Sequence, residues 1–165
     1  MDFQFSDEQR MIIKMVRDFA NKEILPTVEQ RDEEEVFDRG ILDRIGELGL
    51  MGIFFPEEYG GSDGDYLSYI LANEELSRVD DSIACSYAAS VSLCAWPIFT
   101  YGTDEQKKKY LTPLAEGSKL GAFGLTEPNA GTDSASQQTH AEKKDGYYLL
   151  NGSKCFITNG GEADI

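Results

Sequence analysis

Apolar positions recur at helical spacing over most of the first 117 residues. Ser6, Asp7, Glu8 and Gln9 fit a capping box, so a first helix is predicted to begin there. Pro26 is predicted to end it, because proline lacks the amide hydrogen that the next turn needs. A second helix is predicted over about residues 38–48, with Gly49 as its left-handed cap.

Asp65 is predicted to open a third helix that ends near Asp80 and Asp81. Leu67, Ile70, Leu71 and Glu74 fall on one face of this helix at spacings of three and four residues.

Ser82 is predicted to cap a fourth helix that reaches Tyr101. Its many alanines and serines let neighbouring backbones approach closely, which predicts a central position in a helical bundle. Pro97 should kink or break it. A second capping box at Thr103–Gln106 opens a fifth helix toward Leu114.

After Gly117 the helical period gives way to short segments of strand length. Strands are predicted over 120–126, about 136–142, 147–150 and 154–158, with hairpin turns at Asp145-Gly146 and Asn151-Gly152. The predicted class is α+β: an N-terminal all-α helical bundle over 1–117, followed over 118–165 by the start of a barrel-like β domain. Four strands with an open edge are not expected to form a complete domain.

Charge and cysteine usage narrow the functional classes. Lys and Arg number 15 against 30 Asp and Glu, a net charge of −15, which disfavours a nucleic-acid partner. Three cysteines with no C-x-x-C pair fit neither a disulfide framework nor a zinc site. No apolar run approaches the roughly 20 residues of a membrane span, and residues 1–4 do not resemble a signal peptide. A cytoplasmic protein without membrane contact is expected.

Two polar, glycine-containing segments are candidates for binding chemistry. Residues 126–133 could bring backbone amides toward an anion or the edge of a planar ring, although such a loop is often only a turn. In an alternating strand over 154–158, Phe156 and Thr158 would share a face. The plainer alternative is a core phenylalanine beside a solvent-facing threonine. The glycine spacing matches neither a P-loop nor a Rossmann fingerprint.

The sequence AFGLTEPNAGTD at residues 122–133 resembles the flavin-binding segment of the acyl-CoA dehydrogenases. The resemblance extends to NGSKCFITNGG at 151–161 and YGTDEQKKKYL at 101–111, and to the opening FSDEQ and the PEEYGG loop. It covers the whole chain and is strongest toward the short-chain, butyryl-CoA type.

This resemblance implies FAD as cofactor and assigns a first group of residues to it. In similar enzymes the residue matching Phe123 and the main chain at Leu125 pack along the flavin. The match of Thr126 hydrogen-bonds the pyrimidine edge, and Gly124 lies within the same segment.

A second group is implied by the same resemblance. Thr158 corresponds to the hydroxyl near flavin N5, beside Ile157. Phe156 stands where many relatives have Trp, so the aromatic wall stays but the indole donor is lost. Gly131 and Thr132 match positions that approach the cofactor diphosphate and the CoA-bearing substrate.

The family reaction is α,β-dehydrogenation of an acyl-CoA, with electrons passed to an electron-transferring flavoprotein by a homo-oligomer, commonly a tetramer. The catalytic base of the family is a Glu in a C-terminal helical domain, which is expected to lie beyond Ile165. No catalytic residue is therefore assigned here, and these 165 residues are expected to be inactive alone. Glu127 is expected to be structural and His140 not to bind metal.

Two alternatives stay open: an acyl-CoA oxidase or another flavoprotein of the superfamily, and a non-catalytic acidic helical module that binds a partner. The acyl-chain length is not determined by the sequence.

Overall fold

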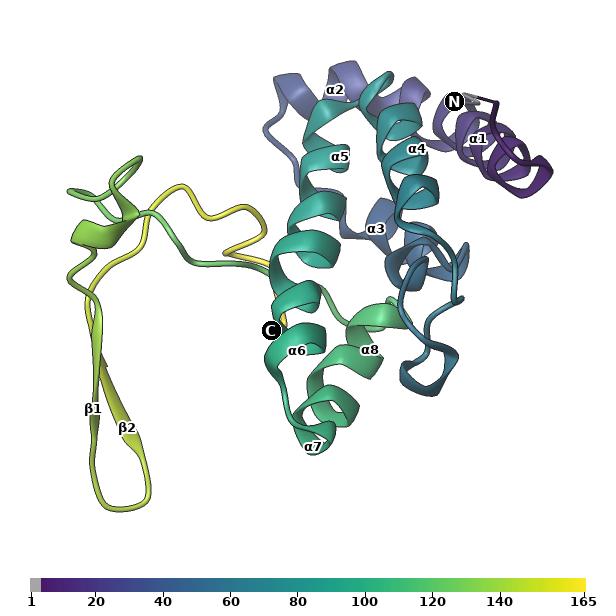
Figure 1. Cartoon of the computed structure of the whole chain (residues 1–165). Coiled ribbons are helices and arrows are strands. Elements are labelled where there is room, and N and C mark those ends of the chain that lie inside the picture. Colours follow the sequence, from purple (N-terminus) through teal and green to yellow (C-terminus); the bar gives the residue numbers. More distant parts are fainter. Residues whose placement is uncertain (1–3) are drawn as a thin grey trace.

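The computed structural model describes residues 4–165, so residues 1–3, where no signal peptide is expected, lie outside the described part. A bundle of helices forms the first part of the chain, and a β-hairpin stands apart from it (Figure 1). The chain then returns to the bundle, where its last residue lies against the long central helix (Figure 1). This α+β arrangement is the predicted fold class.

The helices and strands have the following bounds. The α-helices are α1 (Asp7–Phe19), α2 (Val28–Glu33), α3 (Arg39–Glu47), α4 (Tyr66–Ser77), α5 (Asp81–Ala88), α6 (Trp96–Tyr101), α7 (Asp104–Gln106) and α8 (Thr112–Ala115). Ala20–Ile24, Ala89–Ala95 and Lys107–Leu111 are π-helical, and the strands are β1 (His140–Lys143) and β2 (Tyr148–Asn151). Short 3₁₀ turns occupy Leu25–Thr27, Leu50–Gly52, Glu57–Tyr59 and Ser134–Ser136.

Local capping chemistry acts as the sequence predicts. The amide of Gln9 donates to the Ser6 hydroxyl at 3.1 Å, and the Ser6 amide donates to the Gln9 side chain at 3.0 Å. Thr103 and Gln106 form the same reciprocal pair. Beyond α3, Gly49 has φ 75°, which confirms the left-handed cap.

Pro26 ends the first helical segment, as predicted, but a further helix follows it without an intervening loop. The proline sits in the 3₁₀ turn Leu25–Thr27 and α2 follows directly. An early turn position needs no amide donor, so the proline is tolerated there and α2 can form.

The fourth predicted helix needs two corrections. Asp80, not Ser82, caps it: one carboxylate oxygen accepts from the amides of Ser82 at 2.8 Å and Ile83 at 3.2 Å. Pro97 does not break it, because residues 81–101 form one 21-residue helical stretch. The stretch before the proline is π-helical, and its wider turns accommodate the lost hydrogen bond.

That long stretch also corrects the expectation that no apolar run approaches the length of a membrane span. Within residues 4–165, Asp81–Tyr101 is long and apolar enough to span a membrane, with a mean hydropathy of 1.4. Half of this window is buried inside the protein, and the core helix of a soluble protein passes the same test. One such helix is therefore only weak evidence for a membrane span.

The face shared by Leu67, Ile70, Leu71 and Glu74 is not the one that faces the core. Leu67 and Ile70 are each 45% exposed, whereas Leu71 is buried. Tyr69, Ala72 and Leu76 enter the core instead. The ion pair of Glu75 with Arg17 on α1, at 2.5 Å, fixes this rotation of α4.

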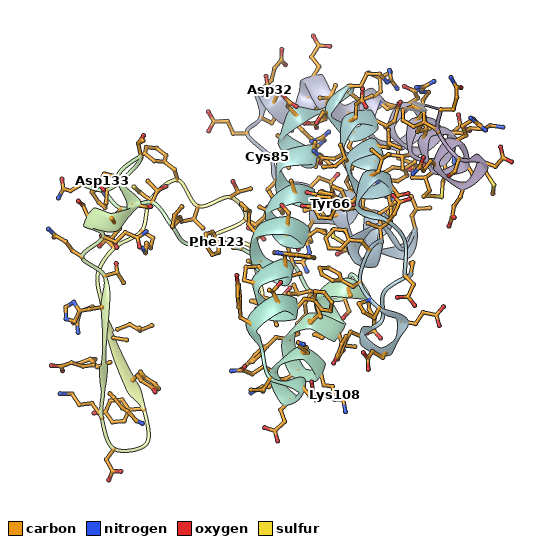
Figure 2. All side chains as sticks on the ribbon, in the orientation of Figure 1. Asp32, Tyr66, Cys85, Lys108, Phe123 and Asp133 are labelled. Carbon is orange, nitrogen blue, oxygen red and sulfur yellow. The ribbon has the colours of Figure 1, made fainter. Side chains whose placement is uncertain are left out.

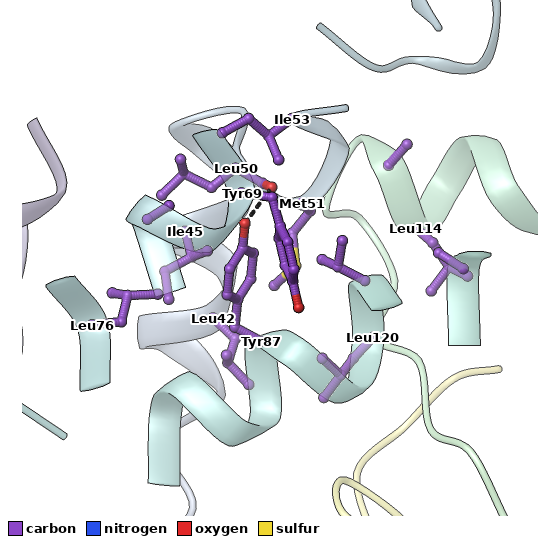
Figure 3. Close-up of a cluster of buried hydrophobic side chains, with 14 of the residues drawn as sticks. Leu42, Ile45, Leu50, Met51, Ile53, Tyr69, Leu76, Tyr87, Leu114 and Leu120 are labelled. Carbon is purple, nitrogen blue, oxygen red and sulfur yellow. Dashed lines mark hydrogen bonds between the residues drawn. The ribbon is translucent and has the colours of Figure 1, made fainter. Parts of the chain in front are cut away.

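The core fills the space between α3, α4 and the long helix. Tyr87 is fully buried, and its hydroxyl donates to the Leu50 carbonyl at 3.0 Å (Figure 3). Leu42, Ile45, Leu76, Leu114 and Leu120 belong to the same buried cluster (Figure 3). Leu120 carries this core into the segment that follows α8.

Two of the four predicted strands form. β1 pairs with β2 in antiparallel register, and the turn at Asp145-Gly146 is confirmed as a hairpin. Asn151-Gly152 makes no hairpin, because Asn151 is still part of β2 and pairs with His140. Gly152 packs tightly on Thr139, where a Cβ would lie 2.1 Å from the hydroxyl. Residues 120–126 and 154–158 are not strands: between them runs a single backbone bond, from the Cys155 amide to the Thr126 carbonyl, rather than a ladder.

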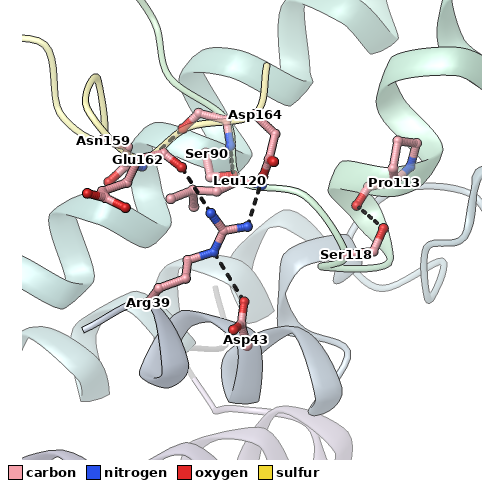
Figure 4. Close-up of polar contacts among 10 residues, drawn as sticks. Arg39, Asp43, Ser90, Pro113, Ser118, Leu120, Asn159, Glu162 and Asp164 are labelled. Atoms are coloured by element: carbon pink, nitrogen blue, oxygen red, sulfur yellow. Dashed lines mark hydrogen bonds and ion pairs between the residues drawn. The ribbon is translucent and has the colours of Figure 1, made fainter. Parts of the chain in front are cut away.

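The last residues of the chain are tied to the helices by one arginine. The Arg39 guanidinium donates to the Glu162 carbonyl at 3.0 Å and to the Asp164 carboxylate at 2.8 Å (Figure 4). Asp164 in turn accepts from the Leu120 amide at 2.9 Å. This network holds residues 160–165 against 120–122 and fixes one end of the candidate site.

Candidate functional site

Three segments surround one groove of about 200 Å³. Its lining residues are Ala89, Leu93, Phe123, Leu125, Thr126, Phe156, Ile157 and Thr158. Six of these are residues that the sequence assigned to a cofactor. Phe123 lies where the chain leaves the bundle toward the hairpin (Figure 2).

Asn159 joins the segments that form the groove. Its side-chain amide donates to the carbonyl of Ser86 on α5 at 2.9 Å and to the carbonyl of Gly121 at 3.0 Å. The residue is 7% exposed and has φ 64°, a left-handed conformation that asparagine tolerates well. This clamp therefore places Thr158 beside the helix and beside residues 123–126.

Phe156 presents its ring to the groove in an unusual way. The residue is 93% exposed and has φ 56°. A non-glycine residue with positive φ interrupts the alternation of a strand. The prediction that Phe156 and Thr158 share one face of a strand is therefore wrong, although both residues line the groove. Such strain and exposure at a large apolar ring are typical of a ligand-contact position.

Thr126 and Thr158 supply polar groups to the same groove. Across residues 4–165, neither hydroxyl has a hydrogen-bond partner, and the backbone amide of Thr126 also has none. Both residues are half-buried. Two aromatic rings with neighbouring unpaired donors and acceptors suit a flat aromatic ligand that has polar edge atoms.

Glu127 follows Thr126 in the chain, but it is buried and is not free to act as a base. Its carboxylate accepts from the amides of Gln138 at 2.7 Å and Thr139 at 3.0 Å, and from the Lys154 ammonium at 2.9 Å. Hydrogen bonds from Thr139, Gln138 and Lys154 lower the pKa of Glu127 to about 2. A carboxylate so strongly stabilised has little tendency to take up a proton, which supports the structural interpretation.

Three residues assigned to the cofactor lie outside the groove. Gly124 packs near the Lys154 side chain, and a Cβ on Gly131 would meet nothing within 4 Å. Thr132 is exposed in the same turn. Their assignment to the cofactor stays a prediction, and it concerns the part of FAD that extends beyond the flavin ring.

His140 and the cysteines offer no metal chemistry. His140 is exposed on β1, and its ring Nδ1 lies 3.1 Å from the Gln138 carbonyl. In the described part of the chain no group of His, Cys, Asp or Glu could hold a metal ion, and the three cysteines are free.

Some groove residues could not be found from the sequence. Ala89 carried no signal beyond its place among small side chains of the long helix, and Asn159 and Lys154 belonged to the resembling segment 151–161 without a role of their own. The larger cavity of about 650 Å³ near α2 contains none of the residues assigned from the sequence, and a buried ion pair, Arg31–Asp80 at 2.6 Å, satisfies its buried charges.

The groove fits a flavin ring but not a whole dinucleotide. Cavities that enclose a drug-sized ligand measure roughly 300–1,000 Å³, and about 200 Å³ is below that range. The aromatic rings, the two free hydroxyls and the Thr126 amide match the faces and edge of an isoalloxazine. The residues present thus suit one side of FAD.

Comparison with known proteins now defines the class. The family profile "Acyl-CoA dehydrogenase, N-terminal domain" matches residues 6–118, and "Acyl-CoA dehydrogenase, middle domain" matches residues 122–165. The chain belongs to the acyl-CoA dehydrogenase family, as its sequence resemblance predicts.

Particular relatives refine this assignment. The chain is 55% identical to "Acyl-CoA dehydrogenase, short-chain specific" of Megasphaera elsdenii, over 100% of this chain and 44% of the relative. A chain in a structure titled "Electron transferring flavoprotein of Acidaminococcus fermentans: Towards a mechanism of flavin-based electron bifurcation" has a TM-score of 0.97 and 58% identity, over 99% of this chain and 43% of that one.

A third structure, an acyl-CoA dehydrogenase complexed with FAD from Bacillus anthracis, has a TM-score of 0.91 and 44% identity, over 98% of this chain and 28% of that one. It confirms the expectation of FAD at the level of the family. The chain spans less than half the length of these relatives.

Proposed function

We propose that this protein takes part in the FAD-dependent α,β-dehydrogenation of short-chain acyl-CoA thioesters, and that its groove receives the isoalloxazine ring. One observation carries this proposal: six residues assigned from the flavin-binding motifs, far apart in sequence, line a single groove. The identity to a short-chain-specific relative supports the substrate class.

Four of the groove residues have a proposed role toward the ring. Phe123 and Phe156 would pack on the ring, and Thr126 would hydrogen-bond its pyrimidine edge through the hydroxyl and the amide. Thr158 would donate near N5. When bound, FAD supplies the acceptor for the β-hydrogen of the thioester, which leaves as a hydride. The protein contributes orientation and polar complementarity.

No carboxylate lines the groove among residues 4–165. Glu127, which follows Thr126 in the chain, is fixed by its hydrogen bonds and ion pair. The α-proton of an acyl-CoA needs a desolvated base. We therefore expect the 165 residues alone to bind FAD weakly and not to turn over butyryl-CoA.

An electron-transferring flavoprotein is the proposed electron acceptor. Met11 on α1 and Leu67 and Ile70 on α4 are exposed apolar side chains. Leu67 and Ile70 are three residues apart on one side of α4. Exposed apolar side chains of this kind suit a protein partner.

Two further parts of the proposal concern the whole protein: a cytoplasmic location and a homotetramer.

An oxidase differs from a dehydrogenase in how fast oxygen reoxidises the flavin. Stopped-flow reoxidation by air, measured on the longest chain that the gene encodes, distinguishes the two.

The central test is substitution of Thr158. In that longest chain, Thr158→Val removes the hydroxyl and keeps the shape, so flavin reduction by butyryl-CoA should become slower while the folding transition stays in place. Thr100→Val, at an exposed position on α6, is the matched control. An unchanged reduction rate in Thr158→Val would remove this hydroxyl from the proposed role, and absence of FAD binding by the wild type would overturn the function itself.

A further inference from the structure

The Leu125 carbonyl is held from two sides by side chains that the proposed reaction does not use. Lys154 donates to it from Nζ at 2.8 Å, and Gln137 donates from Nε2 at 2.6 Å. A carbonyl oxygen has two lone pairs, and both are engaged here. The orientation of the Leu125–Thr126 peptide is consequently fixed.

Lys154 is itself held in place by a buried carboxylate. Its ammonium lies 2.9 Å from Glu127 Oε1, and Glu127 is 7% exposed. The Thr139 amide donates to the same oxygen and the Gln138 amide donates to Oε2, so both carboxylate oxygens are held. The lysine therefore has little freedom to swing into solvent, unlike a surface lysine.

The fixed carbonyl determines where the Thr126 amide points. In a planar trans peptide the C=O and N–H point in opposite directions. With the Leu125 oxygen turned toward Lys154, the Thr126 amide lies on the opposite side of the peptide, where no described residue accepts from it. The next carbonyl, that of Thr126, accepts from the Cys155 amide at 2.9 Å. Both peptides flanking Thr126 are thus tied to residues 154–155.

We propose that Lys154, held by Glu127, is a positioning residue that sets the Leu125–Thr126 peptide so that its free amide and the Thr126 hydroxyl meet the edge of the flavin. This inference rests on the proposed function for its ligand. The geometry of the Leu125–Thr126 peptide does not depend on the proposed function, and it can be measured on the protein without cofactor.

The first measurement uses the longest chain that the gene encodes, without FAD. In Lys154→Met the Cys155 amide should exchange its hydrogen at least several-fold faster, because the segment it bonds to has lost its clamp. Lys144→Met is the matched control: Lys144 pairs with Glu142 at 2.6 Å on the exposed hairpin, away from the groove. Unchanged exchange at Cys155 in Lys154→Met overturns the proposal whether or not FAD binds.

The second measurement uses the longest chain that the gene encodes, loaded with FAD. Lys154→Met should bind FAD about tenfold more weakly, the scale of one charge-assisted hydrogen bond. It should also change the visible circular dichroism of the flavin, which reports the surroundings of the ring. Lys154→Arg, which can still donate to both oxygens, should recover most of the affinity and the wild-type spectrum.

The outcomes separate the two levels of inference. A wild type that does not bind FAD overturns the proposed function and with it the flavin part of this inference. A wild type that binds FAD, with Lys154→Met unchanged in affinity and dichroism, overturns the positioning role alone. A loss of thermal stability with an unchanged spectrum assigns Lys154 and Glu127 to stability only, which also contradicts the proposal.

Discussion

Replacing Asn159 should destabilise the protein strongly, because this side chain holds two parts of the groove together. Its amide satisfies the carbonyls of Ser86 and Gly121, both in a buried setting. Asn159→Ala removes both hydrogen bonds, at about 1–1.5 kcal/mol each. The Gly121 carbonyl is then left without a donor, whereas the Ser86 carbonyl keeps the Ala89 amide. Alanine at φ 64° adds about 1 kcal/mol. The expected loss in the free energy of unfolding is about 3–4 kcal/mol.

Urea unfolding followed by circular dichroism measures this loss, and a second variant separates its two causes. Asn159→Gly removes the same hydrogen bonds but tolerates positive φ, so it should cost about 1 kcal/mol less than Asn159→Ala. Asn129→Ala, at an exposed turn position, should stay within about 0.5 kcal/mol of the wild type. A loss below about 1 kcal/mol for Asn159→Ala would refute the reasoning that this clamp connects the groove to α5.

Three further predictions concern buried polar groups. Tyr87→Phe removes the buried hydroxyl bond to the Leu50 carbonyl, which keeps only the longer bond from the Ile53 amide at 3.3 Å, and should cost about 1–2 kcal/mol in urea unfolding; a neutral result would contradict the burial of that bond. Arg31→Met leaves the buried Asp80 carboxylate unpaired and should cost about 3 kcal/mol, seen as a lower Tm. Because hydrogen bonds hold the pKa of Glu127 at about 2 against an ordinary 4.5, the stability this carboxylate contributes is complete above pH 4.5 and falls as the pH drops toward 2. Glu127→Gln should lose that part of the acid dependence in thermal melts recorded over this range, and an unaltered pH profile would argue against it.

The helix starts could be predicted from sequence because their causes are local. Ser6 and Gln9 are three residues apart and satisfy each other, so no other part of the chain is needed to recognise them. The cap of α5 shows the limit. Asp80 and Ser82 are both good caps, and the choice between them is influenced by Arg31, 49 residues away, which pairs with Asp80. A long-range ion pair leaves no local pattern.

The groove was predictable in its motif residues and not in its geometry. Resemblance identified Thr126 and Thr158, but the strand alternation proposed to align Phe156 with Thr158 does not exist. A left-handed residue at 156 and the Asn159 clamp produce the alignment instead. Neither leaves a period-two or period-3.6 signal. Leu93 entered the groove from a helix whose pattern indicated only a central position.

The distribution of exposed apolar surface argues that the groove is built for an occupant. Phe123, Leu125 and Phe156 are all exposed, and Leu93 joins them from the helix. Such side chains cost free energy in water, which a ring packed against them would recover. Their backbones are instead fixed by Asn159, Lys154 and the Cys155 amide, so the rings stay displayed at little further loss of conformational entropy when a ligand binds. A groove held open in this way should bind a ring with less reorganisation than a loop that must first order itself.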